Sequence, residues 1–598
     1  MQQSQLKKEK EDLGLLPQWD LSEFYKSIND PSINQDLDQI QDRAKNFQQS
    51  YQSKLSSLSG ADLGKAVAIY EKIYEDLDLI ICFAQLHHAI GMDDPKIGQF
   101  YQSVQEKYTE IVGHLLFFTL ELNKIDDATL STQKKDPALS KYEPFLRDIR
   151  IFKPHQLSDD LEQYALDKSI TSHNAWIRLF NETMAGLRFP YQGKDLTSAE
   201  IFSYLSDNNR QHREEAAHSV ANTLSKNSKL LAHIYNTLCK DKDIEDKKRS
   251  YAHPMSSRNL SNYVDDQVVS TLIESVKDYY PKLSHRYFKI KAKWLGLPKL
   301  SYWDRNAPLQ ENADNTYSWD EARDIVLKAY ESFSPKLAHI AKEFFDKNWI
   351  DAKVRSGKDA GAFSHPMVPK AHPFILMNFQ GKTRDIMTLA HELGHGIHQV
   401  LASNQGPLLS QTTLTLAETA SVFGEMLTFQ SLLDNTKDKE AKKLLLASKI
   451  EDMLNTVVRQ IAFCDFEKTV HEKRKTSELT VEDLGKIWME KQHESLGDSF
   501  DFDPEYHVFW SYIPHFIHTP FYVYAYAFGD CLVNSLYDTY LNKPDGFVEK
   551  YMELLSSGGI HHHKEALAPF GLDASDKNFW KKGLSVIERY IDQLEEIS

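Results

Sequence analysis

Helical periodicity along most of the chain is the feature that most limits its fold. Apolar residues recur at spacings of three and four, and only 24 glycines and 21 prolines interrupt 598 residues. Such spacing places apolar side chains on one face of a helix, and amphipathic helices bury these faces against one another. The chain is also long enough to hold more than one core. We therefore predict a mainly α-helical protein with more than one lobe.

One short segment departs from the helical spacing. Residues 372–381, HPFILMNFQG, form an apolar run between Pro373 and Gly381. A short apolar run between such residues is typical of a buried strand, although a buried helical turn has the same composition. We predict a small β element here, and the helical turn stays open as the alternative.

A domain boundary is suggested by residues 186–200, GLRFPYQGKDLTSAE. Pro190 and Gly193 interrupt the helical spacing, and Thr197 with Glu200 forms the pattern of a capping box that opens a new helix. We divide the chain into a helical N-terminal lobe, residues 1–195, and a longer region, residues 196–598. An ordinary loop between two helices of one body is the alternative.

The charge and the cysteines exclude several classes of protein. A net charge of −16 does not suit a nucleic-acid-binding protein, which needs a basic surface. The N-terminal residues lack the apolar core of a signal peptide, and no apolar run is long enough to span a bilayer. The four cysteines are Cys82, Cys239, Cys464 and Cys531. They form no CxxC pair, so neither a disulfide framework nor a thiolate metal site is expected. We expect a soluble cytoplasmic protein.

The segment 383–403, TRDIMTLAHELGHGIHQVLAS, carries candidate metal ligands. Its apolar residues fall on one stripe, which predicts an amphipathic helix. His391 and His395 are four residues apart, so both side chains project from one face. Two imidazoles in this arrangement bind one Zn²⁺, and Glu392 beside them is placed to take a proton from zinc-bound water. The motif HExxH arises by chance in about one such chain in fifteen, so alone it is only suggestive.

A third histidine of this segment, His398, is set aside as a ligand. It lies seven residues after His391, which is about 10 Å along a helix axis, so one ion does not easily bind both. Pairing His395 with His398 would leave Glu392 without a role.

The same segment contains two glycines, which are unfavourable inside a helix. Gly394 and Gly396 each cost roughly 1 kcal/mol relative to alanine inside a helix. This cost is easier to understand if another backbone or a ligand approaches closely. We therefore expect a close neighbour on this side of the helix.

The third ligand has two alternatives. The pattern HExxHxxGxxH would need glycine at 398 and histidine at 401, whereas the chain has His398 and Leu401, so this pattern fails. The other alternative is a carboxylate on the following segment 414–426, LTLAETASVFGEM. Glu418 and Glu425 lie seven residues apart there among small and apolar residues, where a carboxylate needs a partner. We predict Glu418 as ligand and Glu425 as acceptor for a histidine N–H, with surface glutamates as the alternative.

An aromatic segment, residues 510–530, WSYIPHFIHTPFYVYAYAFGD, is dense in tyrosine and histidine. At a spacing of four, Tyr522 and Tyr526 share a helix face, whereas Tyr524 points elsewhere. Phenol and imidazole groups donate hydrogen bonds to an oxyanion when a carbonyl becomes tetrahedral. Aromatic packing in a core is the simpler interpretation of these residues.

Several segments together match one family of enzymes. They are LPQWDLSEFY, KRSYAHPMSSRNLSN, WDRNAPL, HPFILMNFQG, TLAHELGHGIHQ, AETASVFGEML, PHFIHTPFYVYAYAFGD and LSSGG…FGLD. On these segments the chain resembles the oligoendopeptidase F branch of the thimet oligopeptidase family of zinc metallopeptidases. The segments follow the same order from near the N-terminus to the end, so the resemblance covers nearly the whole chain.

The resemblance implies one zinc ion per chain on His391, His395 and Glu418, with Glu392 as the general base. It also implies two helical lobes that flank a deep substrate channel, with a small β element beside the HExxH helix. Residues 1–195 are then an N-terminal lobe of the oligopeptidase F type, and residues 196–598 are the catalytic region.

Further roles are implied for residues outside the zinc motif. His515 and a tyrosine after it, either Tyr522 or Tyr526, are expected to stabilise the transition state. The predicted strand in residues 372–381 is expected to hold the substrate backbone as an added strand.

We predict a zinc-dependent endopeptidase that cuts internal bonds of short unstructured peptides by zinc-activated water. Peptides are the expected partners, no nucleic acid or membrane is expected, and a monomer is favoured. One alternative is a carboxypeptidase of the same family that releases dipeptides. The other is a non-catalytic helical protein that binds peptides.

Overall fold

A computed structural model describes residues 13–309 and 316–597. Most of them lie in helices, and three small sheets accompany the helices, so the prediction of a mainly α-helical fold is confirmed. The chain forms two compact units, and each unit combines three stretches of sequence. Unit 1 contains Met1–Lys153, Asp314–Asn435 and Lys543–Phe570, and unit 2 contains Pro154–Ala313, Thr436–Asn542 and Gly571–Ser598.

The stretch that suggested a boundary forms a hairpin followed by a helix. Strands β1 (Phe189–Tyr191) and β2 (Lys194–Leu196) pair antiparallel, and α11 (Ser198–Ser203) follows. The predicted capping box is present, because Thr197 accepts from the Glu200 N–H and the Glu200 carboxylate accepts from the Thr197 N–H at 2.8 Å. The division at residue 195 stays a prediction.

Unit 1 contains two groups of helices and one sheet. The helices between residues 13 and 153 are α2 (Pro31–Tyr51), α3 (Gly60–Ile90), α4 (Pro95–Gly113), α5 (Leu116–Lys124), α6 (Asp127–Gln133), α7 (Pro137–Ser140) and α8 (Glu143–Arg150). The later helices are α16 (Trp319–Phe333), α17 (Pro335–Asp346), α18 (Thr383–Ala402), α19 (Leu414–Ala417), α20 (Thr419–Asn435), α26 (Phe547–Ser556) and α27 (His563–Leu567). The strands are β4 (Ile350–Asp351), β5 (Phe363–His365) and β6 (Phe374–Leu376).

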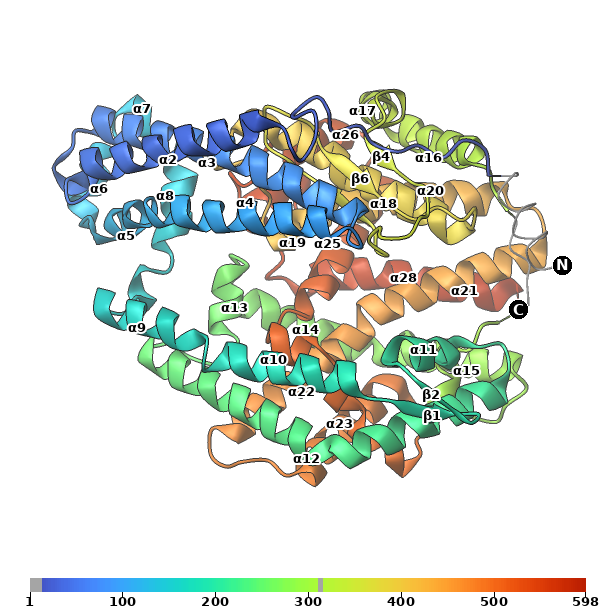
Figure 1. The fold of residues 1–598 in the computed structure, drawn as a ribbon. Coiled ribbons are helices and arrows are strands. Elements are labelled where there is room, and N and C mark those ends of the chain that lie inside the picture. The colour runs from blue at the N-terminus through green and yellow to red at the C-terminus, as the bar shows by residue number, and fades with distance from the viewer. Residues whose placement is uncertain (1–12, 310–315, 598) are drawn as a thin grey trace. The chain divides into compact units, whose positions relative to one another are not determined.

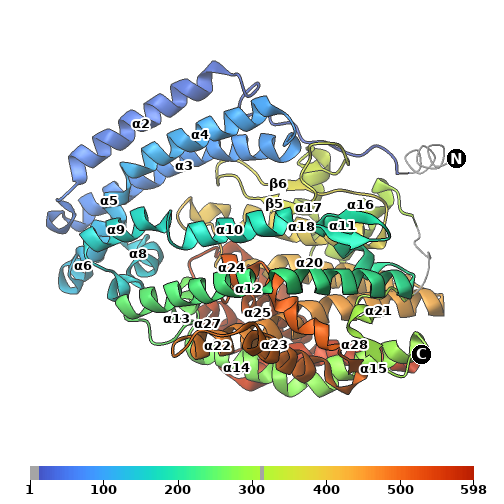
Figure 2. The same ribbon diagram turned by 60° about the horizontal axis from the view of Figure 1, so that its bottom comes forward.

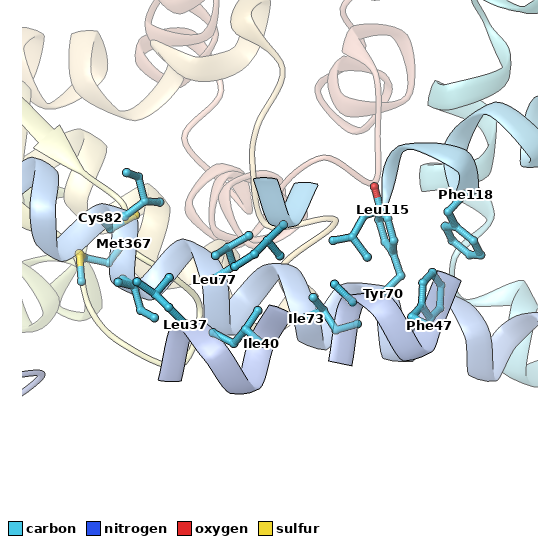
Figure 3. Close-up of a cluster of buried hydrophobic side chains, with 14 of the residues drawn as sticks. Leu37, Ile40, Phe47, Tyr70, Ile73, Leu77, Cys82, Leu115, Phe118 and Met367 are labelled. Carbon is cyan, nitrogen blue, oxygen red and sulfur yellow. The ribbon is translucent and has the colours of Figure 1, made fainter. Parts of the chain in front are cut away.

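A continuous apolar core joins the first group of helices to the sheet of unit 1. Helices α2, α3 and α4 run side by side (Figure 1). Figure 3 shows side chains of α2 and α3 meeting Leu115, Phe118 and Met367. Phe374 and Leu376 of β6 belong to the same buried cluster. Burial of this apolar surface holds α3 close to the loop that follows β5.

The sheet of unit 1 has the order β4-β6-β5. The strand predicted in residues 372–381 is confirmed over Phe374–Leu376, where all three residues are buried. Strand β6 pairs in parallel with β4 and antiparallel with β5, so it is the central strand. Its main-chain groups are therefore used on both sides, and only β5 and β4 have an outer edge.

Unit 2 is a set of packed helices with two small sheets. Its helices besides α11 are α9 (Asp159–Ser169), α10 (His173–Gly186), α12 (Arg210–Lys248), α13 (Ser256–Ser261), α14 (Asp266–Tyr279), α15 (Ser284–Trp294), α21 (Lys439–Thr456), α22 (Val458–Arg474), α23 (Val481–Leu496), α24 (His515–His518), α25 (Tyr524–Asn542) and α28 (Lys577–Ile597). Its second sheet pairs β3 (Leu300–Ser301) with β7 (Phe500–Asp501). Helix α10 lies along the long helix α12 (Figure 2).

Over residues 13–309 and 316–597, none of the helices combines the length and the apolar character that crossing a bilayer requires.

Candidate metal centre

The N-terminus of helix α18, which carries the HExxH motif, is fixed by a turn and by hydrogen bonds. Gly381 turns the chain before the helix with φ of +82°, a conformation that costs glycine little. The Asp385 carboxylate accepts from the backbone N–H groups of Gln380 and Lys382, at 2.7 and 3.0 Å. These bonds satisfy donors at the helix N-terminus, and the negative charge suits the helix dipole.

The two glycines of α18 are explained by close neighbours. A Cβ atom on Gly394 would lie 2.4 Å from the carbonyl oxygen of Ala420 and 2.5 Å from the Cα of Ser421, both in α20. A Cβ atom on Gly396 would lie 2.5 Å from the ring of Phe344. The expected close approach of another backbone is thus found at Gly394, while a side chain fills the space at Gly396.

The contact between α18 and α20 brings three candidate ligands together. The Nε2 atoms of His391 and His395 each lie 3.4 Å from Oε2 of Glu418, which is the residue between α19 and α20. The three ligand atoms all lie within 4.8 Å of one another. Ligand atoms about 2.1 Å from a tetrahedral zinc ion are about 3.4 Å apart, so this donor set fits zinc.

Two further side chains orient these ligands. The Nδ1 atom of His391 lies 3.3 Å from Oε2 of Glu425, which is the contact predicted for this glutamate. The Ser421 hydroxyl donates to Oε2 of Glu418 at 2.6 Å. Such contacts fix the tautomer and the direction of metal ligands. Ser421 was not anticipated, although its position three residues after Glu418 was a usable signal.

Glu392 lies beside the ligands with one oxygen unused. The residue is buried, and its Oε2 atom has no hydrogen-bond partner among the residues that the structure describes. Burial raises the pKa of the Glu392 carboxyl to about 7, and the charge of Glu418 adds to the rise, while His391 and a hydrogen bond from the Ser364 backbone oppose it. A carboxyl with this pKa takes and returns a proton readily near neutral pH.

The charges of the site favour a divalent cation. Burial lowers the pKa of His395 to about 4, so its imidazole is neutral at neutral pH, as a metal ligand must be. For His391, burial acts to lower the pKa, but the bond to Glu425 and the charge of Glu418 outweigh it and raise the pKa. Carboxylates on Glu392, Glu418 and Glu425 thus surround two imidazoles, and a cation would offset their mutual repulsion.

His398 lies apart from the three ligand atoms. It is buried, and its Nε2 atom lies 3.2 Å from the Thr412 hydroxyl. Burial lowers the pKa of His398 to about 3, so it is neutral. It does not belong to the cluster of His391, His395 and Glu418.

The central position of β6 in its sheet contradicts the expectation that a peptide substrate binds to this strand. Because β6 is central, residues 374–376 cannot accept an added strand, so that expectation is wrong for them. The neighbouring strand β5 is at the edge of the sheet, and its outer edge lies against α18. The Ser364 carbonyl accepts from the Gln399 side chain at 3.1 Å, and the Ser364 hydroxyl donates to it at 2.8 Å. Strand β5 was missed because three residues carry too little alternation to be recognised.

His515, Tyr522 and Tyr526 form a cluster of their own in unit 2. The Nε2 atom of His515 lies 3.3 Å from the Tyr526 hydroxyl, and the rings of Tyr522 and Tyr526 are 5.3 Å apart. Tyr522 lies in the turn before α25, which begins at Tyr524, so the two tyrosines do not share a helix face as expected. Tyr524 points elsewhere, as predicted, and is buried with its hydroxyl bonded to Asn262 at 2.8 Å.

Comparisons with known proteins match the chain to a family of peptidases. The pattern of Peptidase family M3 matches residues 203–586, and that of Oligopeptidase F matches residues 121–189. Oligopeptidase PepF of Bacillus subtilis is 26% identical over 97% of this chain and 87% of its own length. An oligoendopeptidase F homolog of Borreliella burgdorferi is also 26% identical, over 97% of this chain and 98% of its own.

Solved structures share the fold. A putative peptidase from Chlamydophila abortus superimposes with a TM-score of 0.86 at 23% identity, over 97% of this chain and 98% of its own. The matches and the site place the chain in the class of metalloendopeptidases. The chain belongs to Peptidase family M3.

Proposed function

We propose that the chain is a zinc-dependent endopeptidase of short unstructured peptides. The observation that carries this proposal is the cluster of His391, His395 and Glu418, with the buried carboxyl of Glu392 next to it. Two imidazoles and one carboxylate are a frequent zinc set in enzymes that leave a coordination position open. The names of the oligoendopeptidase F relatives support the same activity.

The ligand residues and Glu392 have distinct tasks in this proposal. When bound, zinc supplies Lewis acidity, which makes water more acidic and a peptide carbonyl more electrophilic. Glu392 accepts the proton of the attacking water and later delivers it to the leaving amine. Its raised pKa suits both transfers, since a stronger acid would not hold the proton between them.

The developing oxyanion needs donors, and we assign them to His515 with Tyr522 or Tyr526. The contact between His515 and Tyr526 supports their acting as a pair. Hydrogen bonds that strengthen as charge develops lower the barrier, and losing one such donor costs a factor of about 10² to 10³ in rate.

The outward main-chain groups of Ser364 in β5 are already used, since its N–H donates to Glu392 and its carbonyl accepts from Gln399. We therefore place no added strand at this residue. The deep channel between lobes, the cytoplasmic location and the monomeric state stay predictions.

A peptide blocked at both ends tests the activity. The zinc-loaded chain should cut an internally quenched decapeptide with an acetylated N-terminus and an amidated C-terminus, and mass spectrometry should locate the cut inside it. Chelation should stop cleavage and added zinc should restore it. Cleavage only of peptides with a free C-terminus, two residues from it, would favour the dipeptide-releasing alternative. Peptide binding without cleavage at one zinc per chain would contradict the proposal.

A further inference from the structure

Two neighbouring cavities of unit 1 extend from the metal centre to helix α3. The first, of about 460 Å³, is lined by the candidate ligand His395 at one place and by Asp78 of α3 at another. The second, of about 880 Å³, runs from Asp78 to Glu106 of α4. Both cavities share four residues in their walls, which are Asp78, Pro366, Met367 and Gln411. Asp78 therefore lies where the two cavities meet.

The Asp78 carboxylate is held at this place without a cation. The Tyr108 hydroxyl donates to its Oδ1 atom at 3.0 Å. Leu77, the preceding residue, is fully buried in the core that joins α3 to the sheet, so α3 is fixed beside the cavities. Burial raises the pKa of Asp78. Within residues 13–309 and 316–597, no lysine, arginine or histidine forms an ion pair with it.

The remaining walls supply no positive charge to Asp78. No lysine or arginine of the described chain lines either cavity. Burial lowers the pKa of His365 and of His398 to about 4 and about 3, so both are neutral at neutral pH. His372 in the first cavity is paired with Glu23 at 2.6 Å. A partly buried carboxylate without a countercharge costs free energy, and an incoming cation would reduce that cost.

We propose that Asp78 is a specificity residue that binds a positively charged group of the peptide. The recognised chemistry is an ammonium or guanidinium group, which comes from a lysine or arginine side chain or from the free N-terminal amine. The cavity that leads from His395 to Asp78 gives a bound peptide a continuous path between the two. This inference rests on the proposed function, since it names the peptides that the same site prefers.

Matched peptides test the preference on the unaltered chain. In a series of decapeptides, a single lysine is placed at each position in turn. Each lysine peptide is compared with the same peptide carrying norleucine or glutamate at that position. Every peptide is made with a free and with an acetylated N-terminus. We expect kcat/KM at the zinc-loaded chain to be about ten-fold higher for the cationic member, because a hydrogen-bonded cation adds about that factor. A preference that acetylation removes identifies the N-terminal amine, and one that norleucine removes identifies the side chain.

Two variants separate the charge of Asp78 from its packing. Asp78→Asn keeps the size and an acceptor for Tyr108, and it should bring the cationic and norleucine peptides to equal kcat/KM. Tyr108→Phe removes the neutral donor of the same wall, and it should keep the preference. Equal rates for all three peptides and for their free and acetylated forms at the unaltered chain, or an unchanged preference in Asp78→Asn, would overturn the inference.

A binding measurement keeps this inference distinct from the proposed activity. Fluorescence anisotropy with labelled peptides, on zinc-loaded Glu392→Gln, should show the same ten-fold preference and its loss in the double variant with Asp78→Asn. If the unaltered chain cuts no peptide but this preference is present, the proposed function fails and the inference stands. If peptides are cut but neither assay shows an Asp78-dependent preference, the inference fails alone.

Discussion

Gly394 lies directly against the Ala420 backbone, where the helix with the two histidines packs on the helix that follows Glu418. The space there has no room for one further carbon, since a Cβ on Gly394 would lie 2.4 Å from the Ala420 carbonyl oxygen. The geometry of the ligand cluster therefore depends on a residue that binds nothing itself.

Replacing Gly394 by alanine should push the two helices apart. Overpacking of this kind costs about 1–3 kcal/mol, and we expect zinc affinity to fall by about ten-fold or more, measured by competition with a chromophoric chelator. Gly98 of α4 is the matched control, because a Cβ there meets nothing within 4 Å. Gly98→Ala should leave zinc affinity unchanged and raise the melting temperature slightly. Equal zinc affinity in both variants would contradict the account.

Loss of Glu425 should weaken zinc binding although this residue is not a ligand. Its carboxylate holds Nδ1 of His391, and removing such a partner lowers metal affinity by about 10- to 100-fold. We expect this loss in Glu425→Ala and a smaller one in Glu425→Gln, by chelator competition. Asp434→Ala changes an exposed carboxylate of the same helix, bonded to Gln430, and should have no effect. An affinity for zinc in Glu425→Ala equal to that of Asp434→Ala would refute the assigned role.

His398 and His395 should respond differently to replacement. His398→Ala should keep close to one zinc per chain by atomic emission, because His398 is bonded to Thr412 outside the cluster. It should lower the melting temperature, since it leaves a buried void. His395→Ala should lose the zinc. Loss of zinc in a folded His398→Ala protein would require a different ligand set.

The stability of unit 2 should carry a pH dependence from Glu467. This carboxyl is buried, it accepts from the Phe521 N–H at 3.0 Å, and burial raises its pKa to about 8 from 4.5. Between these values the folded state keeps a proton that the unfolded state has released, so stability falls as pH rises, by about 1.4 kcal/mol per pH unit. Glu467→Gln should flatten the melting temperature between pH 5 and 8. An equal slope in both proteins would show that Glu467 is ionised when folded.

Much of the candidate site could be predicted because it depends on short spacings. The shared face of His391 and His395 follows from helix geometry, which is local. Their contact with Glu418 depends on how α18 packs against α20, and only the glycine at 394 indicated it. Glu418 stood out because it lies among small and apolar residues, and the family resemblance implied the same ligand.

The features that the sequence did not predict depend on contacts between distant parts of the chain. Whether residues 374–376 form a central or an edge strand is decided by β4 and β5, which are two and three residues long and leave no pattern. The composition of unit 1 from three stretches also follows from packing and not from local breaks. Asp78 sits in a helix far from the zinc motif, so nothing in its own segment related it to a cavity beside His395.

The most direct test of the central claim is peptide cleavage by zinc-loaded Glu392→Gln. Glutamine has the size of glutamate but accepts no proton at neutral pH, so the account predicts one zinc per chain and a kcat lowered by a factor of about 10² to 10⁴ on the doubly blocked decapeptide. The unaltered chain, prepared with the same zinc content, is the reference. A kcat of Glu392→Gln within a few-fold of that reference would contradict the assignment of Glu392 as the base.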